Sequence, residues 1–542
     1  MPTKYVVVLG SLLSGLGKGV VTASIVKILQ LYNFKVLPFK FDGYLNYDCG
    51  TMNPYRHGEV FVLDDKSEVD MDFGTYERFS GINLSGDCSL TGGKVFSEIV
   101  QNERKGAYLG QDVQIIPHLT DLLIEKVRKV AETNKLDVLV IEVGGTIGDI
   151  ENSYFIEAMR QLALTEKVVF VNITYIPILK AVGEQKTKPT QLAFRSLMQA
   201  GIMPNIMVCR SEAPLGEQTR KKLALFTNLK ESNIFDDSDL QSIYELPLHL
   251  LGQEFDKVLL NELGLDSQST KINSKELAAW KAAVSRIKNP TKEVSIAIVG
   301  KYTALRDAYA SVKEALTHAG ALNDARVNIK WVESSELESK SAEDLLADVD
   351  GIIVPGGFGS RGTEGKINAI RFARENNVPF LGLCLGMQLM AVEYARNVCG
   401  LKGANSTEFD PHARYKIIDL LPSQLKIVYK GGTMRLGSWK CKIVDKKSIA
   451  YAAYGSTEIC ERHRHRYEFN NAYRNLLRKK GLKITGLTPD NKLVEIIEWP
   501  NGYGVGTQAH PELKSKLLKP APLFDSFVRA SLARRQAKKT VT

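Results

Sequence analysis

The stretch Val378-Pro-Phe-Leu-Gly-Leu-Cys-Leu-Gly-Met-Gln388 decides the fold of the second half of the chain. An apolar run typical of a parallel strand enters it, a helix-like run leaves it, and Gly382 and Gly386 flank Cys384 between them. This pattern predicts a nucleophile elbow, a tight turn in which neighbours without a Cβ surround a residue of sparsely allowed backbone conformation. We expect the thiol to be exposed at the carboxyl end of a sheet and at a helix N-terminus, which favours thiolate. The alternative is a small buried hydrophobe in a core strand.

Two further segments supply the other parts of a hydrolytic site. In Gly506-Thr-Gln-Ala-His-Pro-Glu512, His510 and Glu512 are two residues apart, so on extended backbone both side chains leave the same face. We expect His510 to be the base and Glu512 to orient its imidazole. Upstream, a strand at residues 352–355 runs into a Gly-rich loop, whose N–H groups we expect to face a developing oxyanion.

These pieces, in this order, resemble a class I glutamine amidotransferase domain. The resemblance implies that Cys384 is the nucleophile, that His510 and Glu512 complete a triad, and that the loop around Gly356 and Gly357 is the oxyanion hole. Domains of this family hydrolyse glutamine and pass ammonia to a second active site. The other half of the chain is therefore expected to hold an ammonia acceptor.

Length and composition indicate a soluble protein of two or three domains. The 542 residues are 44% apolar and 24% charged, with no apolar run long enough for a membrane span and no signal-peptide pattern. Seven scattered cysteines without a CxxC pair predict neither a disulfide framework nor a zinc site, which fits a reducing, cytoplasmic location. The net charge of +10 is spread along the chain, so we expect binding to neither nucleic acid nor membrane.

Hydrophobic patterning predicts an α/β fold in both halves. A strand at residues 5–9, a helix at 19–31 and a strand at 35–41 form a βαβ start. Further strands are expected at 137–143, 168–174 and 205–209, whereas 42–113 is expected to form long functional loops.

The charged, helix-like residues 266–292 are expected to be a linker, after which strands recur at 294–299, 352–355 and 379–383. We predict a P-loop-like, doubly wound, mainly parallel sheet in residues 1–265. Residues 293–542 are predicted to form an open, flavodoxin-like sheet of the class I glutamine amidotransferase type.

The loop Gly10-Ser-Leu-Leu-Ser-Gly-Leu-Gly-Lys-Gly19 follows the first strand and opens a helix, a setting that favours phosphate binding. Lys18 is placed to meet a terminal phosphate. The loop is not a standard Walker A motif, because Gly19 stands where Ser or Thr would reach Mg²⁺. Taken alone, it fits a tight turn equally well.

Acidic and basic groups accompany this loop. Lys40 and Asp42 close the second strand, carboxylates alternate in Glu68-Val-Asp-Met-Asp72, and Glu142 ends a buried strand. Carboxylates beside a phosphate loop suit Mg²⁺, the alternative being a solvated acidic loop. The run Gly183-Glu-Gln-Lys-Thr-Lys-Pro-Thr-Gln191 is a second anion-binding cluster, which indicates two nucleotides or one nucleotide and another anionic substrate.

Four long motifs, at residues 50–61, 108–118, 186–191 and 462–468, resemble the CTP synthase family over essentially the whole chain. The resemblance implies a ligase of pyrimidine nucleotide synthesis that phosphorylates O4 of UTP with ATP and Mg²⁺. Ammonia from glutamine, channelled between the sites, then displaces the phosphate to give CTP. It also implies GTP activation, CTP feedback inhibition and a homotetramer, with filaments as a further assembly.

Site residues follow from the resemblance by position. The resemblance assigns Asp72 and Glu142 to Mg²⁺ and assigns Phe358 and Arg361 to the GTP response. It assigns Pro54, His57 and Val60 to the ammonia passage. It assigns to ATP the residues Ser14, Gly15, Leu16, Gly17, Lys18, Gly19, Lys40 and Asp72. The UTP and CTP site, across a subunit interface, takes Ser14, Asp149, Ile150, Glu151, Lys186, Thr187, Lys188, Pro189, Thr190, Gln191 and Lys222. The resemblance assigns the glutamine contacts to Gly357, Leu385, Gln388, Glu408 and Arg466.

Among the positions at which the chain departs from the family pattern are Leu9, Ser11, Gly15, Gly43 and Thr75. We expect these changes to act on nucleotide affinity or choice. Two alternatives stay open beside CTP synthesis. One is an amidoligase that acts on corrin carboxylates, a family without the Lys-Thr-Lys-Pro-Thr-Gln loop. The other is a non-catalytic, filament-forming or regulatory protein. The presence of all three predicted triad residues argues against this second alternative.

Overall fold

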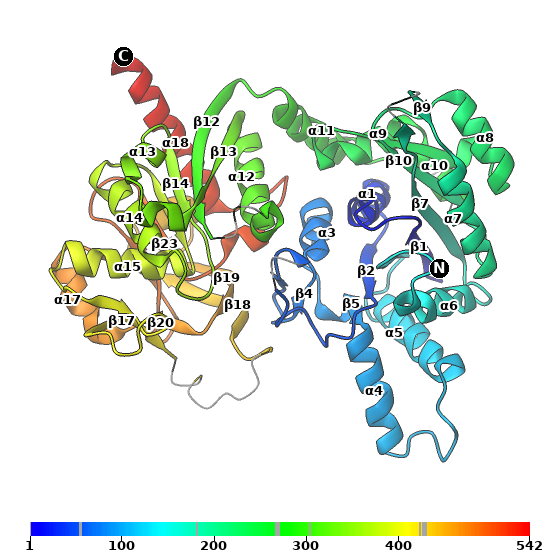
Figure 1. Cartoon of the computed structure of the whole chain (residues 1–542), viewed down its shortest axis with the longest axis horizontal. Helices are drawn as coiled ribbons and strands as arrows, with labels where there is room; N and C mark the ends of the chain where they lie inside the picture. Colours follow the sequence, from blue (N-terminus) through cyan, green and yellow to red (C-terminus); the bar gives the residue numbers. More distant parts are fainter. Residues whose placement is uncertain are drawn as a thin grey trace. The chain divides into compact units, whose positions relative to one another are not determined.

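The computed structural model describes residues 2–53, 57–179, 181, 183–265, 271–301, 303, 305–421, 424 and 431–541. The chain divides into two compact units. The first unit comprises Met1–Asp48 and Thr75–Val284, and the second comprises Cys49–Gly74 and Ser285–Thr542. Each unit contains its own sheet covered by helices (Figure 1).

The sheet of the first unit has seven parallel strands in the order β11-β10-β7-β1-β6-β2-β5. They are β1 (Lys4–Gly10), β2 (Val36–Asp42), β5 (Ser89–Thr91), β6 (Val138–Val143), β7 (Val168–Tyr175), β10 (Ile206–Ser211) and β11 (Ile234–Ser238). The predicted doubly wound parallel sheet and its five predicted strands are confirmed. Strands β2 and β7 lie on opposite sides of β1, so the strand order reverses there. Ligands of such sheets bind at the carboxyl ends of the strands near this point.

Helices cover both faces of this sheet. On one face, α1 (Lys18–Leu31), α9 (Leu246–Gly252) and α10 (Phe255–Glu262) share a core with β1, β6 and β7. On the other face, Phe155 stacks on Phe41 of β2 at 4.6 Å between ring centroids. Phe155 belongs to α6 (Ser153–Leu162), which packs against α5 (Thr120–Thr133). Beyond them lie α7 (Lys188–Gln199), α8 (Glu217–Thr227) and the hairpin of β8 (Ile178–Leu179) and β9 (Glu184–Gln185).

The prediction of long loops over residues 42–113 is wrong. This segment contains α3 (Asp72–Ser80), α4 (Gly92–Arg104), strand β5 and the hairpin of β3 (Phe61–Val62) and β4 (Glu68–Val69). Its glycines serve close packing: a Cβ on Gly93 would lie 2.5 Å from the carbonyl oxygen of Leu45. The Thr91 hydroxyl caps α4 by accepting from the Lys94 N–H at 3.1 Å.

Residues 274–288 form α11 (Ser274–Lys288), which agrees with the predicted helical character. Trp280 is 1% exposed, and its indole N–H donates to the carbonyl oxygen of Tyr244 at 2.9 Å. Lys27 of α1 forms an ion pair with Glu276. Residues 274–284 of this helix are therefore packed into the first unit rather than extended in solvent.

The second unit contains a nine-stranded sheet in the order β13-β12-β14-β15-β23-β22-β21-β18-β19. From β13 to β23 the pairs are parallel, and from β23 onward they are antiparallel. The strands are β12 (Lys292–Gly300), β13 (Ala325–Glu333), β14 (Gly351–Val354), β15 (Phe380–Leu383), β18 (Arg435–Ile443), β19 (Glu458–His465), β21 (Lys483–Leu487), β22 (Val494–Glu498) and β23 (Gly504–Thr507). The predicted open sheet and its three predicted strands are confirmed, and an antiparallel extension is added to them.

Helices again cover both faces. Side chains of α14 (Thr363–Glu375) and α15 (Leu385–Asn397) share one core with Ala297 and Val299 of β12. Side chains of α12 (Ala310–Leu322) and α18 (Pro522–Val541) share the other with Ile296 and Ile298. The remaining elements are α13 (Ala342–Leu346), α16 (Ile449–Tyr454), α17 (Arg474–Lys479) and a small sheet of β16 (Ala404–Ser406), β17 (Tyr415–Leu420) and β20 (Tyr467–Phe469).

The adjacent strands β14, β15 and β23 place three predicted site segments at one edge of this sheet. Gly356 follows β14, Cys384 follows β15, and His510 follows β23. Among the helices that the structure describes, none is both long and apolar enough to cross a bilayer.

Candidate active site

Cys384 lies between β15 and α15 in a nucleophile elbow, as predicted. Its backbone has φ 52° and ψ −101°, outside the regions that L-residues commonly occupy. A Cβ on Gly382 would lie 2.7 Å from the carbonyl carbon of Gly386, and one on Gly386 would lie 2.0 Å from the carbonyl oxygen of Val354. Both glycines are therefore required by the packing of the turn.

The prediction that the thiol is exposed is wrong. Cys384 is 5% exposed and lines a cavity of about 530 Å³ within the second unit. Two polar groups that were not predicted lie against its sulfur: Nε2 of Gln508 at 3.6 Å and the carbonyl oxygen of Arg464 at 3.8 Å. Their only sequence signal is proximity to the predicted motifs, since Gln508 precedes His510 by two residues.

His510 and Glu512 form a close pair. Nδ1 of His510 lies 2.7 Å from Oε1 of Glu512, which is 3% exposed. The predicted extended geometry is wrong, because Glu512 lies in a short 3₁₀ helix, Pro511–Lys514, and His510 precedes it with φ −116° and ψ 75°. Pro511 is favoured at the first helical position, which turns the chain and brings the carboxylate back toward the imidazole.

Electrostatics favour an imidazolium at this position. Burial lowers the pKa of His510, but the negative charges of Glu512 and of a Cys384 thiolate outweigh it and hold that pKa well above its ordinary value. Within the described residues, Nε2 of His510 has no partner at full hydrogen-bond geometry. A Cβ on Gly356 would lie 2.9 Å from Cε1 of His510 and 3.8 Å from Cβ of Cys384. The missing side chain of Gly356 thus leaves room for both reacting groups.

The Gly-rich loop after β14 carries several of the predicted residues. The N–H of Gly359 donates to Oε1 of Glu408 at 2.8 Å, and burial raises the pKa of this carboxyl. Phe358 is 42% exposed, and the guanidinium of Arg464 lies 5.3 Å from the centre of its ring. Arg361 donates to the carbonyl oxygen of Lys301. The predicted GTP-response residues, Phe358 and Arg361, therefore lie on the same loop as the predicted oxyanion hole.

Two of the five predicted glutamine contacts lie in the cavity that holds the thiol. Gly357 and Arg466 line the cavity with Cys384, His510 and Glu512. The guanidinium of Arg466 donates to Oε1 of Gln424 at 2.6 Å. Leu385 and Gln388 are buried behind the elbow, 2% and 3% exposed.

The segment Cys49–Gly74 forms another wall of the cavity, which the sequence did not predict. It is held by two ion pairs to β19: Arg462 to Asp64 at 2.7 Å and Arg464 to Glu68 at 2.8 Å. The interpretation of Glu68 as part of an acidic, metal-binding face is therefore wrong, because its carboxylate is buried against Arg464.

The predicted ammonia passage is only partly visible. Val60 lines the cavity, whereas His57 is exposed. Pro54 lies outside the described residues.

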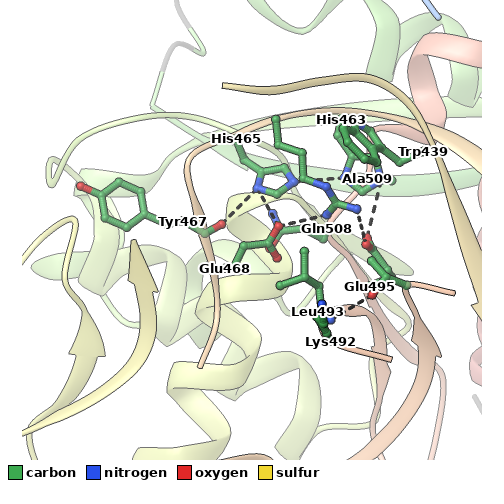
Figure 2. Close-up of polar contacts among 12 residues, drawn as sticks. Trp439, His463, His465, Tyr467, Glu468, Lys492, Leu493, Glu495, Gln508 and Ala509 are labelled. Atoms are coloured by element: carbon green, nitrogen blue, oxygen red, sulfur yellow. Dashed lines mark hydrogen bonds and ion pairs between the residues drawn. The ribbon is translucent and has the colours of Figure 1, made fainter. Parts of the chain in front are cut away.

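Side chains from β18, β19, β20 and β22 form a buried cluster of charged and imidazole groups (Figure 2). Arg435 pairs with Glu468 at 3.0 Å and with Glu495 at 2.6 Å, and Nδ1 of His463 lies 3.0 Å from Nε2 of His465. Burial lowers the pKa of both histidines well below the ordinary value and raises the pKa of Glu468 to about 8. One guanidinium between two buried carboxyls therefore favours one ionised acid, one protonated acid and two neutral imidazoles.

In the first unit, the loop at residues 10–19 wraps around Lys18. Its ammonium donates to the carbonyl oxygen of Gly145 at 2.7 Å, and a Cβ on Gly10 would lie 2.7 Å from its Cδ. Gly17 caps α1 with φ 84°. Of the other residues assigned to ATP, Leu16 and Gly19 are buried, whereas Ser14 and Gly15 are exposed.

Three of the departures from the family pattern, Leu9, Ser11 and Gly15, lie in this loop or next to it. Leu9 and Ser11 are 1% and 0% exposed, beneath the loop rather than on its open side. Gly43 is required in this chain, because a Cβ there would lie 2.3 Å from Oδ1 of Asn152.

Charged groups gather at the carboxyl ends of β2 and β6. Lys40 lies 3.4 Å from Asp42 and is in register with Glu142 across the strand pair. The hydroxyl of Tyr76 donates to Glu142. Asp72 opens α3 and belongs to the second unit. Among the described residues, no group of three or more His, Cys, Asp or Glu side chains is arranged to hold a metal ion without further ligands.

The residues assigned to the pyrimidine nucleotide are of two kinds. Thr187, Thr190 and Gln191 are buried and bonded within the protein; Thr190, for example, donates to the carbonyl oxygen of Tyr175 at 3.0 Å. Exposed or half-buried groups are presented by Asp149, Ile150, Glu151, Lys186, Lys188, Pro189 and Lys222. Lys186 and Lys222 both lower the pKa of Glu184, which places α8 beside this loop.

Comparison with known proteins accounts for both units. Residues 4–265 match the family described as CTP synthase N-terminus, and residues 304–530 match glutamine amidotransferase class-I. The chain is 50% identical over 533 residues to the CTP synthase of Caldanaerobacter subterraneus subsp. tengcongensis, covering 98% of each chain. It is 47% identical over 542 residues to that of Methanocaldococcus jannaschii, covering 98% of this chain and 99% of the relative.

A solved glutaminase domain of Trypanosoma brucei CTPS with bound acivicin is 40% identical and covers 44% of this chain and 93% of that domain, with a TM-score of 0.42. Both family matches and the full-length relatives agree on one assignment. The chain belongs to the CTP synthase family of glutamine-dependent ligases.

Proposed function

We propose that this enzyme converts UTP, ATP and ammonia into CTP, and that it releases the ammonia from glutamine at Cys384. The observation that carries the proposal is the elbow itself. It holds the thiol in a cavity together with the His510–Glu512 pair, on a chain whose other unit carries a lysine-bearing loop at the carboxyl end of a parallel sheet.

In the glutaminase step, His510 takes the thiol proton and the Cys384 sulfur attacks the carboxamide carbon. The tetrahedral oxyanion faces the loop at Gly357, whose backbone donors suit it. His510 returns the proton to the departing nitrogen, so ammonia leaves and a thioester forms; water then cleaves the thioester to glutamate. Glu512 keeps the imidazole in one orientation and stabilises its cationic form.

Glutamine has two charged ends, and we assign one group to each: Arg466, which lines the cavity, and Glu408, which accepts from Gly359 of the Gly-rich loop. Glu408 is suited to the α-ammonium and Arg466 to the α-carboxylate. Gly357, Leu385 and Gln388 complete the proposed contacts. Phe358 and Arg361, which lie on the same loop as Gly357, are proposed to mediate the response to GTP.

In the synthetase step, the γ-phosphoryl group of ATP passes to O4 of UTP, and ammonia displaces inorganic phosphate to give CTP. Lys18 and Lys40 are the proposed phosphate contacts, with residues 14–19 as the cradle. Asp72 and Glu142 are the proposed ligands of Mg²⁺, an ion that binds one or two carboxylates plus phosphate oxygens. Bound there, Mg²⁺ would neutralise the charge on the transferred phosphoryl group.

The pyrimidine nucleotide is proposed to bind at Asp149–Glu151 and at the 186–191 loop with Lys222. Ammonia is proposed to pass by Pro54, His57 and Val60, which keeps it from protonation in water. We further propose a cytoplasmic homotetramer, CTP feedback inhibition and the functional division at residues 1–265, 266–292 and 293–542.

The proposal is tested by following CTP formation from UTP, ATP and Mg²⁺, with GTP present, from two nitrogen sources. CTP from both glutamine and ammonium chloride supports it. CTP from ammonium alone contradicts the glutaminase assignment, and no CTP from either source contradicts the synthetase assignment.

A further inference from the structure

We propose that Gln508 is a further residue of the catalytic site, whose side-chain amide donates to the sulfur of Cys384 and favours its thiolate form. The inference rests on the proposed glutamine hydrolysis at Cys384. Gln508 is 0% exposed, and its Nε2 lies 3.6 Å from the sulfur. A buried N–H donor aimed at a thiolate stabilises it, because a hydrogen bond to the charged form of a group favours that form.

The direction of this amide is fixed by the backbone. The carbonyl oxygen of Tyr467 accepts from Nε2 of Gln388 at 2.9 Å, and a carbonyl oxygen has no hydrogen to donate. The amide of Gln388 must therefore present its nitrogen to Tyr467. The same nitrogen lies 3.3 Å from Oε1 of Gln508 and donates its second hydrogen there. The oxygen of Gln508 is thereby committed to Gln388, which leaves its nitrogen for Cys384.

The carbonyl of Tyr467 is itself held by a second donor. Nδ1 of His465 donates to it at 3.1 Å, as the dashed line in Figure 2 shows. Nε2 of His465 is then an acceptor, and it takes the Nδ1 hydrogen of His463 at 3.0 Å. Both imidazoles are at most 2% exposed, which favours their neutral forms.

The charges around these imidazoles keep them neutral. Arg435 and His510 lower their pKa values, and the carboxyls that face them, Glu468 and Glu495, are shared with the Arg435 guanidinium. The tautomers of the two imidazoles are therefore set within the buried cluster, whereas the direction of the hydrogen bonds that lead to Cys384 is fixed by the Tyr467 carbonyl.

Gln508 also offsets an unfavourable contact of the Cys384 sulfur. The carbonyl oxygen of Arg464, 3.8 Å from the sulfur, can accept from a thiol S–H but repels a thiolate. Beside the His510 imidazolium, Gln508 therefore supplies a second donor to the thiolate that offsets this carbonyl. The backbone N–H of Gln508 donates to the carbonyl oxygen of Glu495 at 2.8 Å, which anchors the residue at the end of β23.

The test is Gln508→Glu, which retains an oxygen for Gln388 and places a second carboxylate oxygen against the sulfur. Alkylation of Cys384 by iodoacetamide is followed on its own peptide by mass spectrometry across a pH series, which separates it from the exposed Cys460. We expect the pH midpoint for Cys384 alkylation to rise by about one unit, which slows the reaction about tenfold below that midpoint.

Two further variants keep the result interpretable. Gln508→Met removes the donor without adding charge, and we expect a rise in the midpoint that is smaller than for Gln508→Glu. Gln536→Glu makes the same chemical change on the exposed face of α18 and is expected to leave the midpoint in place. The proposal would be overturned if Gln508→Met left the midpoint unchanged and Gln508→Glu, where it folds, did so too. Variants that lower the thermal stability without moving the midpoint would show that Gln508 only packs the core.

The alkylation readout is independent of CTP synthesis. A shifted midpoint in a protein that hydrolyses no glutamine would support the Gln508 contact and contradict the proposed function. An unshifted midpoint in a protein that hydrolyses glutamine would contradict the Gln508 contact and support the proposed function.

Discussion

The imidazole Nδ1 of His510 lies 2.7 Å from Oε1 of Glu512, and the two residues are joined by a turn rather than by an extended strand. The carboxylate reaches the imidazole because Pro511 starts a 3₁₀ helix between them. This contact orients the proposed base and helps to raise its pKa.

The first prediction concerns Glu512→Gln. The change removes a negative charge that raises the pKa of His510, so the imidazolium should lose its proton at lower pH. The imidazolium is the proposed acid for the departing ammonia, and the alkaline limb of the glutaminase kcat profile should therefore move to lower pH. We expect kcat to fall roughly 100-fold. A profile that keeps its alkaline limb would contradict the role of Glu512.

Gly356→Ala tests the space between the reacting groups. The new Cβ would lie 2.9 Å from Cε1 of His510, which is closer than carbon atoms pack, so the imidazole must shift. We expect glutamine-dependent CTP formation to fall at least about tenfold while ammonia-dependent formation persists. Gly252→Ala is the control, since a Cβ there would meet no atom within 4 Å. Equal glutamine-dependent rates in the two variants would refute the steric argument.

Much of this site could be predicted because local sequence dictates it. The glycines around Cys384 are demanded by backbone contacts within a few residues and with the adjacent strand β14, and they leave a clear motif. The parallel strands of both sheets leave long apolar runs. The helix α4 was missed because Gly92 and Gly93, which begin it and pack against the main chain, have the composition of a loop.

The remaining walls of the site depend on contacts between distant segments. Glu68 and Arg464 are almost 400 residues apart, and only the fold pairs them. Gln508 was overlooked for a similar reason, since its role depends on Gln388 and on a backbone carbonyl that carries no sequence signal. Charged residues in particular were ambiguous, because the same carboxylate suits a metal or a buried ion pair.

Lys18→Met tests the nucleotide loop. Its ammonium folds over Gly10 to the carbonyl oxygen of Gly145, in a place suited to a terminal phosphate. We expect CTP formation to fall by two orders of magnitude or more with either nitrogen source, because the charge that stabilises phosphoryl transfer is gone. Basal glutaminase activity should remain. Lys167→Met, at an exposed position of the same unit, is the control. CTP synthesis at the parental rate in Lys18→Met would rule out the phosphate role.

Trp280→Ala tests the docking of α11. The indole is 1% exposed and donates to the carbonyl oxygen of Tyr244, so truncation leaves a cavity and an unsatisfied carbonyl. We expect the free energy of unfolding of the first unit to fall by about 3–5 kcal/mol in urea titrations. Leu225→Ala, at a side chain 77% exposed, should change it by less than about 0.5 kcal/mol. A small effect at Trp280 would mean that α11 is not part of the folded unit.

The most direct test of the central claim is CTP formation by Cys384→Ala with each nitrogen source. The account predicts that glutamine no longer supports CTP synthesis and that ammonium chloride supports it at the parental rate, because the two reactions use separate sites. Retained glutamine-dependent synthesis would contradict the assignment of Cys384. Loss of both activities in a folded protein would contradict the division into two sites.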